Sequence, residues 1–151
     1  MIGKMSQAQI KALLAQQLIA RIGCSSKGKP YVVPVYFAYD DGIIYCQSRE
    51  GLKLNMMREN PSVCLLIDDI GNLSNWRSAV VWGKFTELTV APSIRKAASV
   101  MEAKFFPLAT GGQVIHTPDN SHPPEVVEKG LKAIYFQVKI AEMTGRFEKI
   151  Q

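Results

Sequence analysis

The segment 31–48 limits the possible folds more than any other part of this chain, because it reads as two strands joined by a tight turn. Strands are predicted at 31–39 and 43–48. Between them, Asp40-Asp41-Gly42 supplies the Asp-Gly step that hairpin turns favour, since glycine accepts positive φ without a Cβ clash. Pro34 lies within the first strand, and a proline cannot donate to a strand ladder. We therefore expect Pro34 at an edge, at a bulge, or where the backbone faces something other than a strand.

The rest of the chain favours further strands that mostly meet through short turns. Strands are predicted at 19–25, 63–68, 78–89 and 131–140, with a turn at 26–29 and a polar loop at 69–75. The apolar run 63–68 predicts a fully buried strand. Gly83 is expected to mark a bulge or a bend, which a barrel needs in order to curve its strands.

Three helices accompany these strands. The first begins at Ser6, where Ser6-x-x-Gln9 fits a capping box; the second spans 52–59; the third opens at Pro92 and runs to about 105. The stretch 107–124 has no periodicity, which is typical of a lid, a binding loop or disorder. Six strands and three helices predict a mainly β fold with α additions, a small antiparallel barrel that forms a single domain over 1–151.

Composition and charge exclude several classes of protein. The chain has 151 residues, 47% of them apolar and 21% charged, which is ordinary for one globular domain. No apolar run approaches the ~20 residues that a membrane span needs. There is no signal-peptide core, so a cytoplasmic location is expected. The 18 basic and 13 acidic residues leave a net charge of +5. The basic residues are spread out, so no nucleic-acid partner is expected.

The cysteines and histidines form no metal or disulfide pattern. Cys24, Cys46 and Cys64 are odd in number and none belongs to a CxxC pair, so we expect reduced core thiols. His116 and His122 lie in one loop with no cysteine nearby, so no metal site is expected. These histidines could act as acid–base groups or substrate contacts, or could simply be exposed.

A cluster of polar residues follows the second strand of the hairpin. Ser48, Arg49 and Lys53 lie where that strand ends and a helix begins. A hydroxyl, two cations and a helix start can together hold a phosphate, with the arginine offering a planar fork and the lysine a point charge. The alternative is a solvated helix start, where positive charge is mildly unfavourable to the helix dipole. That penalty favours a compensating anion, such as a phosphorylated small molecule.

Several pieces of the sequence, taken in order, resemble the flavin-binding split-barrel family, which includes the pyridoxamine-phosphate oxidases and the nitroimidazole-resistance (Nim-type) proteins. The matching pieces are Ala20-Arg-Ile-Gly23, Gly28-Lys-Pro-Tyr-Val-Val-Pro-Val35, Asp41-Gly-Ile-Ile-Tyr45, Gly51-Leu-Lys53, Glu59-Asn-Pro61 and Trp76-Arg-Ser-Ala-Val-Val-Trp-Gly83. The resemblance runs over about 18–88 and returns at 143–146. It implies a six-stranded antiparallel split β-barrel with FMN held between two subunits, and hence a homodimer.

The resemblance also implies which residues contact the cofactor. That set is Pro34, Val35, Gln47, Ser48, Arg49, Lys53, Trp76, Arg77 and Ser78. The cations and Ser48 would hold the phosphate, while Pro34 and Val35 would face the isoalloxazine through their backbone and Gln47 would reach a flavin edge. The strand start at 76–78 would lie near the cofactor, although the tryptophan could serve packing instead. Thr144-Gly-Arg146 could close over the phosphate tail or be a solvated strand end.

The implied function is that of an FMN-dependent oxidoreductase acting on an unknown small molecule, in which the flavin supplies the redox chemistry. The alternatives are a non-enzymatic flavin carrier, a haem-binding module, or a deazaflavin-dependent reductase. Two differences from the resembling proteins argue against particular activities. Cys46-Gln47 stands where many Nim-type relatives carry histidine, which argues against nitroimidazole reduction. No separate arginine-rich substrate-phosphate site is found near the C-terminus, which argues against pyridoxamine-phosphate oxidase activity.

Overall fold

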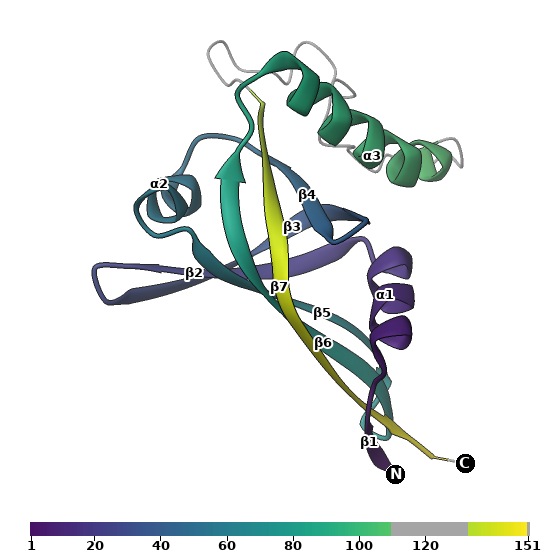
Figure 1. Cartoon of the computed structure of the whole chain (residues 1–151). Coiled ribbons are helices and arrows are strands. Elements are labelled where there is room, and N and C mark those ends of the chain that lie inside the picture. The colour runs from purple at the N-terminus through teal and green to yellow at the C-terminus, as the bar shows by residue number, and fades with distance from the viewer. Residues whose placement is uncertain (110–132, 151) are drawn as a thin grey trace.

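The computed structural model describes residues 1–109 and 133–150 of the chain, as a strongly bent sheet with three helices placed around it (Figure 1). In chain order the elements are β1 (Ile2–Lys4), α1 (Gln7–Gln16), β2 (Ile19–Ser26), β3 (Lys29–Asp40), β4 (Ile43–Ser48), α2 (Leu52–Glu59), β5 (Ser62–Asn72), β6 (Asn75–Glu87), α3 (Ala91–Ala109) and β7 (Ile134–Lys149).

Six of the strands form a closed ring. They are hydrogen-bonded in the order β7-β4-β3-β2-β5-β6, and β6 pairs back onto β7, always antiparallel. The short β1 pairs with the far end of β7 and lies outside the ring. The ring is split because β3 changes partner: residues 29–36 pair with β2, and 37–40 pair with β4. The predicted six-stranded antiparallel split β-barrel is therefore confirmed.

Both early hairpins use the predicted turns. Asp41 and Gly42 have φ of 45° and 80°, and Lys27 and Gly28 have φ of 52° and 77°. Two consecutive residues at positive φ are typical of the type I′ turn, whose twist matches that of the flanking strands. The turns thus set the registers of β2 with β3 and of β3 with β4.

Two helices close the ends of the barrel. The α1 helix begins with the predicted capping box, in which the Gln9 N–H donates to Ser6 Oγ at 3.2 Å and the Ser6 N–H donates to Gln9 Oε1 at 2.8 Å. Its buried residues Ile10, Leu13 and Leu14 join the barrel core. From α2, Leu54, Met56 and Met57 enter the same core. Figure 1 shows these two helices on different sides of the sheet, with α2 beside the upper part of the barrel.

The third helix packs on the outer face of the ring. A second apolar cluster contains Ala97, Met101 and Phe105 of α3 together with Ala38 and Tyr45 of the sheet. The α3 helix thereby covers parts of β3, β4 and β7, as Figure 1 also shows. The outer faces of β2, β5 and β6 contribute nothing to this cluster.

Gly83 marks a bulge, as predicted. The register of β6 on β7 shifts between Trp82, which pairs with Glu142, and Gly83, which pairs with Ile140. A Cβ at position 83 would collide with the carbonyl oxygen of Lys139, so only glycine fits this close approach of two strands.

Four expectations about the strands need correction. The predicted polar loop 69–75 is mostly strand, because β5 extends to Asn72 and β6 begins at Asn75. The segment 63–68 is not fully buried but alternates, with Leu66 on the exposed face. The last strand runs 134–149 instead of ending at 140, and β1 was not expected. The added strand residues gain backbone partners through pairing that local composition did not indicate, whereas Leu66 is exposed because it lies on the outer face of β5.

Candidate functional site

The junction of β4 and α2 brings the predicted phosphate ligands together. β4 ends at Ser48, and only Arg49, Glu50 and Gly51 separate it from the first turn of α2. Gly51 occupies the N-cap position and offers no side-chain hydrogen bond. The first N–H groups of α2 are therefore left without a side-chain cap, and such groups attract anions. We call Ser48, Arg49, Lys53 and this helix end the cradle.

Lys53 is the residue of the cradle with the strongest need for a partner. Its side chain is half-buried, and burial lowers the pKa of its ammonium group. Within residues 1–109 and 133–150 it forms no hydrogen bond and no ion pair, and its nearest titratable neighbours are the thiols of Cys46 and Cys24. Burial also raises the pKa of both thiols, that of Cys46 to about 12, so they stay neutral. A cation taken partly out of water in this way is stabilised by an added anion.

Ser48 and Arg49 are both accessible at the same place. The Ser48 hydroxyl donates locally to the Arg49 carbonyl oxygen at 2.9 Å. The Arg49 side chain is exposed and makes no ion pair with any described residue. Its guanidinium is thus available to an oxyanion from solution.

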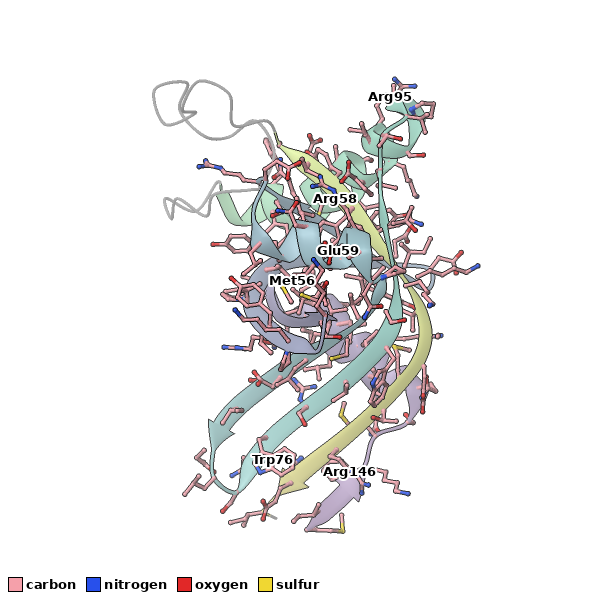
Figure 2. The ribbon with its side chains drawn as sticks, turned by 90° about the vertical axis from the view of Figure 1, so that its left-hand side faces the viewer. Met56, Arg58, Glu59, Trp76, Arg95 and Arg146 are labelled. Carbon is pink, nitrogen blue, oxygen red and sulfur yellow. The ribbon has the colours of Figure 1, made fainter. Side chains whose placement is uncertain are left out.

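One further residue of this junction was missed by the sequence reasoning. Arg58, which Figure 2 labels on α2, lies in the last turn of that helix. It donates to both carboxylate oxygens of Glu50 at 2.6 and 2.9 Å and to Glu87 at 2.7 Å. It also donates to Asn55 at 3.3 Å. No sequence spacing indicates this cluster, since Glu87 reaches it only through the fold of β6.

Pro34 and Val35 lie where β3 has an open edge. The Phe37 N–H donates to Leu18 O on the β2 side, so alternation points the backbone of Pro34 away from β2. β4 pairs with β3 only at 37–40, so no described strand meets that edge at Pro34. The missing N–H of the proline is therefore at the open edge, as the sequence predicted. The side chain of Val35 points into the core, whereas Pro34 lies on the exposed outer face.

Gln47 carries a buried acceptor that has no donor. It is the one buried polar residue among those described, at 9% exposure, and its Oε1 makes no hydrogen bond. It pairs with Tyr135 on β7, and alternation puts it on the same face of β4 as Tyr45. An unpaired buried carbonyl oxygen costs free energy until a donor reaches it.

Trp76, Arg77 and Ser78 lie at the opposite end of the molecule. Figure 2 shows Trp76 and Arg146 near the bottom, far below Met56 and Arg58 of α2. Trp76 Nε1 donates to Glu148 Oε2 at 3.0 Å. Arg77 donates to Asp69 Oδ2 at 2.7 Å and to Gln16 Oε1 at 3.1 Å. A single chain therefore does not bring these residues, or Thr144–Arg146, to the cradle.

Two pockets of the structure lie away from the cradle. A cavity of about 590 Å³ lies at the far end, lined by residues that include Gln9, Asp69 and Trp76. A groove of about 540 Å³ runs over the outer face of the sheet, past Val32, Cys64 and Trp82. His116 and His122 lie outside the described residues.

No helix of the described residues packs on the outer face of β2, β5 and β6, which carries exposed apolar side chains together with the Arg21–Asp68 ion pair. The register places Val32, Gly23, Cys64 and Trp82 in one row across four strands. Val32 is 66% exposed and Trp82 41%. We call this surface, with Pro34, Leu66 and Ile70, the bare face. Alternation puts Trp76 and Ser78 on the same face at its far end.

The described part of the chain contains neither a metal-binding cluster nor a membrane-spanning helix. No group of three or more His, Cys, Asp or Glu side chains is arranged to hold a metal ion. No helix there is long and apolar enough to cross a membrane. The three cysteines are unpaired, with Cys24 and Cys46 buried and Cys64 partly exposed.

Comparison with known sequences finds one family and one relative of nearly equal length. The sequence profile described as "Pyridoxamine 5'-phosphate oxidase" matches residues 6–147. Protein RA0666 of Rhizobium meliloti (strain 1021) is 31% identical over 146 residues, which is 94% of this chain and 92% of that protein.

Two of the solved structures with the same fold illustrate the similarity. An FAD-binding protein from Mesorhizobium loti has a TM-score of 0.77 and 24% identity, covering 99% of this chain and 98% of its own. A candidate 5-nitroimidazole antibiotic resistance protein from Bacteroides thetaiotaomicron has a TM-score of 0.72 and 22% identity, covering 97% and 87%. At these identities the likeness establishes the fold alone.

Proposed function

Because the chain belongs to the pyridoxamine 5'-phosphate oxidase family, we propose that it binds FMN at the cradle and acts as a flavin-dependent oxidoreductase on a small molecule. The observation that carries this proposal is the half-buried Lys53, which has no anionic partner among the described residues and lies in the first turn of a helix without a side-chain cap. These groups fit a phosphate monoester. The similar FAD-binding protein from Mesorhizobium loti supports a flavin as the ligand.

The chain's own residues would bind and orient the cofactor. Ser48, Arg49 and Lys53 would hold the phosphate through charge-assisted hydrogen bonds. The open edge of β3 at Pro34 and Val35 would lie against the flat ring. Gln47 Oε1 would accept a hydrogen bond from a ring N–H, which would satisfy its unpaired oxygen. The flavin supplies the electron transfer when bound, so the protein needs no acid or base of its own for that step.

We further propose that the bare face joins two copies of the chain. Exposed apolar side chains gathered on one sheet face commonly mark an interface. A two-fold pairing in which the strands of the two faces run oppositely would place Trp76 and Ser78 of one copy toward Pro34 and the cradle of the other. This arrangement would bring Trp76 and Ser78 to the other predicted cofactor residues, whereas Arg77 lies on the opposite face of β6 and bonds to Asp69 and Gln16.

The cofactor is tested by titrating purified protein with FMN, FAD and riboflavin and by weighing any cofactor that co-purifies. FMN should bind at least about tenfold more tightly than riboflavin, since one charged hydrogen bond contributes about 1.5–3 kcal/mol. Equal affinities would remove the phosphate from the cradle. A co-purified haem or deazaflavin would favour those alternatives, and a flavin that no reductant or acceptor turns over would favour a carrier.

The homodimer is tested by light scattering at micromolar concentration, where twice the chain mass of 16.7 kDa is expected. Val32→Asp should shift the population toward the monomer, because it puts a charge into an apolar interface. A monomeric wild type that binds FMN would remove the shared site. A cytoplasmic location fits the three unpaired thiols and would be tested by fractionation.

A further inference from the structure

Arg58 ties together three segments that meet beside the cradle. Its guanidinium forms a two-bond fork with Glu50, which precedes α2, and a bond with Glu87 at the end of β6. The side chain lies back along the helix past Asn55, so that the last turn of α2 reaches the residue before its first turn. Single exposed ion pairs contribute little, but a bidentate network with two carboxylates is the favourable exception.

The same contacts control the charge next to the cradle. Glu50 stands directly between Arg49 and the N-cap Gly51, where a free carboxylate would repel an incoming phosphate. Hydrogen bonding to Arg58 lowers the pKa of Glu50, so this carboxylate is ionised at neutral pH, and Arg58 is its ion-pair partner among the described residues. Glu87 is held by the same guanidinium.

We propose that Arg58 is a positioning residue for the cradle: it fixes the 49–51 loop and offsets part of the negative charge of Glu50 and Glu87, so that Arg49 and the end of α2 can receive a phosphate. This inference rests on the proposed FMN site. Arg58 itself does not touch the ligand in this scheme, because its donors are already engaged by Glu50, Glu87 and Asn55.

The test compares FMN and riboflavin binding across four variants. Arg58→Gln should weaken FMN about tenfold, since it leaves two uncompensated carboxylates close to the phosphate, and should change riboflavin less than about twofold. Arg58→Gln combined with Glu50→Gln should recover most of the FMN affinity, because one of those charges is gone. The FMN affinity of Arg58→Lys should lie between those of the wild type and Arg58→Gln, because a lysine keeps the charge but loses the planar fork of the guanidinium. The control is Lys96→Gln, which removes the Lys96–Asp40 ion pair on α3 and should change neither affinity.

A second measurement needs no flavin. Amide hydrogen exchange at 49–52 should be faster in Arg58→Gln and Arg58→Lys than in the wild type, and unchanged in Lys96→Gln. If Arg58→Gln weakens both flavins equally, or if Glu50→Gln gives no recovery, Arg58 is only structural and the inference is wrong. A wild type that binds FMN and riboflavin equally would instead overturn the proposed phosphate site, while the exchange rates still decide whether Arg58 orders the loop.

Discussion

The two ends of the barrel differ in whether the predicted cofactor residues there have hydrogen-bond partners within the chain. At the far end, Trp76 and Arg77 each have a hydrogen-bond partner in Glu148, Asp69 or Gln16. At the α2 end, Lys53 and the buried oxygen of Gln47 have no partner among the described residues. Polar groups that a fold leaves unpaired cost free energy and persist where a ligand completes them. The contrast therefore supports the proposal that the α2 end holds the ligand.

The largest expected effect is on Lys53, the unpaired cation. Lys53→Ala should weaken FMN binding about tenfold or more, which is about 1.4 kcal/mol, because one phosphate contact is lost. The free energy of unfolding without flavin should stay within about 0.5 kcal/mol of the wild-type value, since the described residues give Lys53 no partner. Flavin fluorescence titration and thermal melts measure both. Arg49→Ala should behave alike, and the effects of the two substitutions should be coupled because they share one anion.

The contrast between the two ends would be reversed if Lys53→Ala had a lower melting temperature without flavin and an unchanged FMN affinity. Lys53 would then be structural, and the phosphate would lie elsewhere, with Arg77 and Arg146 as the next residues to replace.

Gln47 offers a test at the same end that does not depend on charge. Gln47→Met removes the unpaired oxygen, so the protein without flavin should be stabilised by about 1 kcal/mol. For a chain of this length that corresponds to a rise of about 2–4 °C in melting temperature. FMN and riboflavin affinities should both fall, since the amide is expected to meet the ring and not the phosphate. A lower melting temperature would mean that Gln47 is already satisfied within the protein.

The opposite pattern is expected at the far end. Arg77→Ala breaks two hydrogen bonds at a partly exposed site and should destabilise the fold by about 0.5–1 kcal/mol. FMN affinity should change little, and the control is Arg77→Lys, which keeps the charge near Asp69. A loss of FMN affinity with an unchanged melting temperature would return Arg77 to the cofactor site.

The smallest effect concerns Lys104, which has partners but no counter-ion among the described residues. Its Nζ donates to Leu14 O at 3.2 Å and Phe37 O at 3.1 Å, and burial lowers its pKa to about 8. Between pH 8 and 10.5 the unfolded chain holds this proton more firmly than the folded one, so stability rises with pH across that window. After allowance for solvent screening we expect about a few tenths of a kcal/mol per pH unit. Denaturant melts of the wild type and of Lys104→Met at pH 7.5 and 9.5 measure the change in unfolding free energy with pH. The same change in both proteins would contradict the prediction.

The sequence predicted the elements whose signals are local. The capping box at Ser6, the Asp41-Gly42 turn, the bulge at Gly83 and the bounds of α2 each depend on a few neighbouring residues, and all are confirmed. The strand through 69–72 was missed because its residues are exposed on both faces, so composition alone resembles a loop. It is strand only because β6 supplies its hydrogen bonds.

The site was predictable to the same degree. Ser48, Arg49 and Lys53 are close in sequence, and the structure keeps them together. The separation of Trp76 from them depends on how far β6 extends, and the Arg58 cluster depends on where β6 ends. Neither can be judged from residue spacing, since both are set by long-range strand register.

The ring cannot close without β7, which is the last of its six strands along the chain. β7 pairs with β4, whose residues lie about ninety positions earlier, and with β6, from which α3 and the segment 110–132 separate it. Such non-local pairing pays its loop-closure entropy before any contact forms, which slows folding. Until β7 arrives, β4 and β6 each present a free edge that can pair with another unfinished chain. We therefore expect refolding of this protein to be slow, and its yield to fall as protein concentration rises.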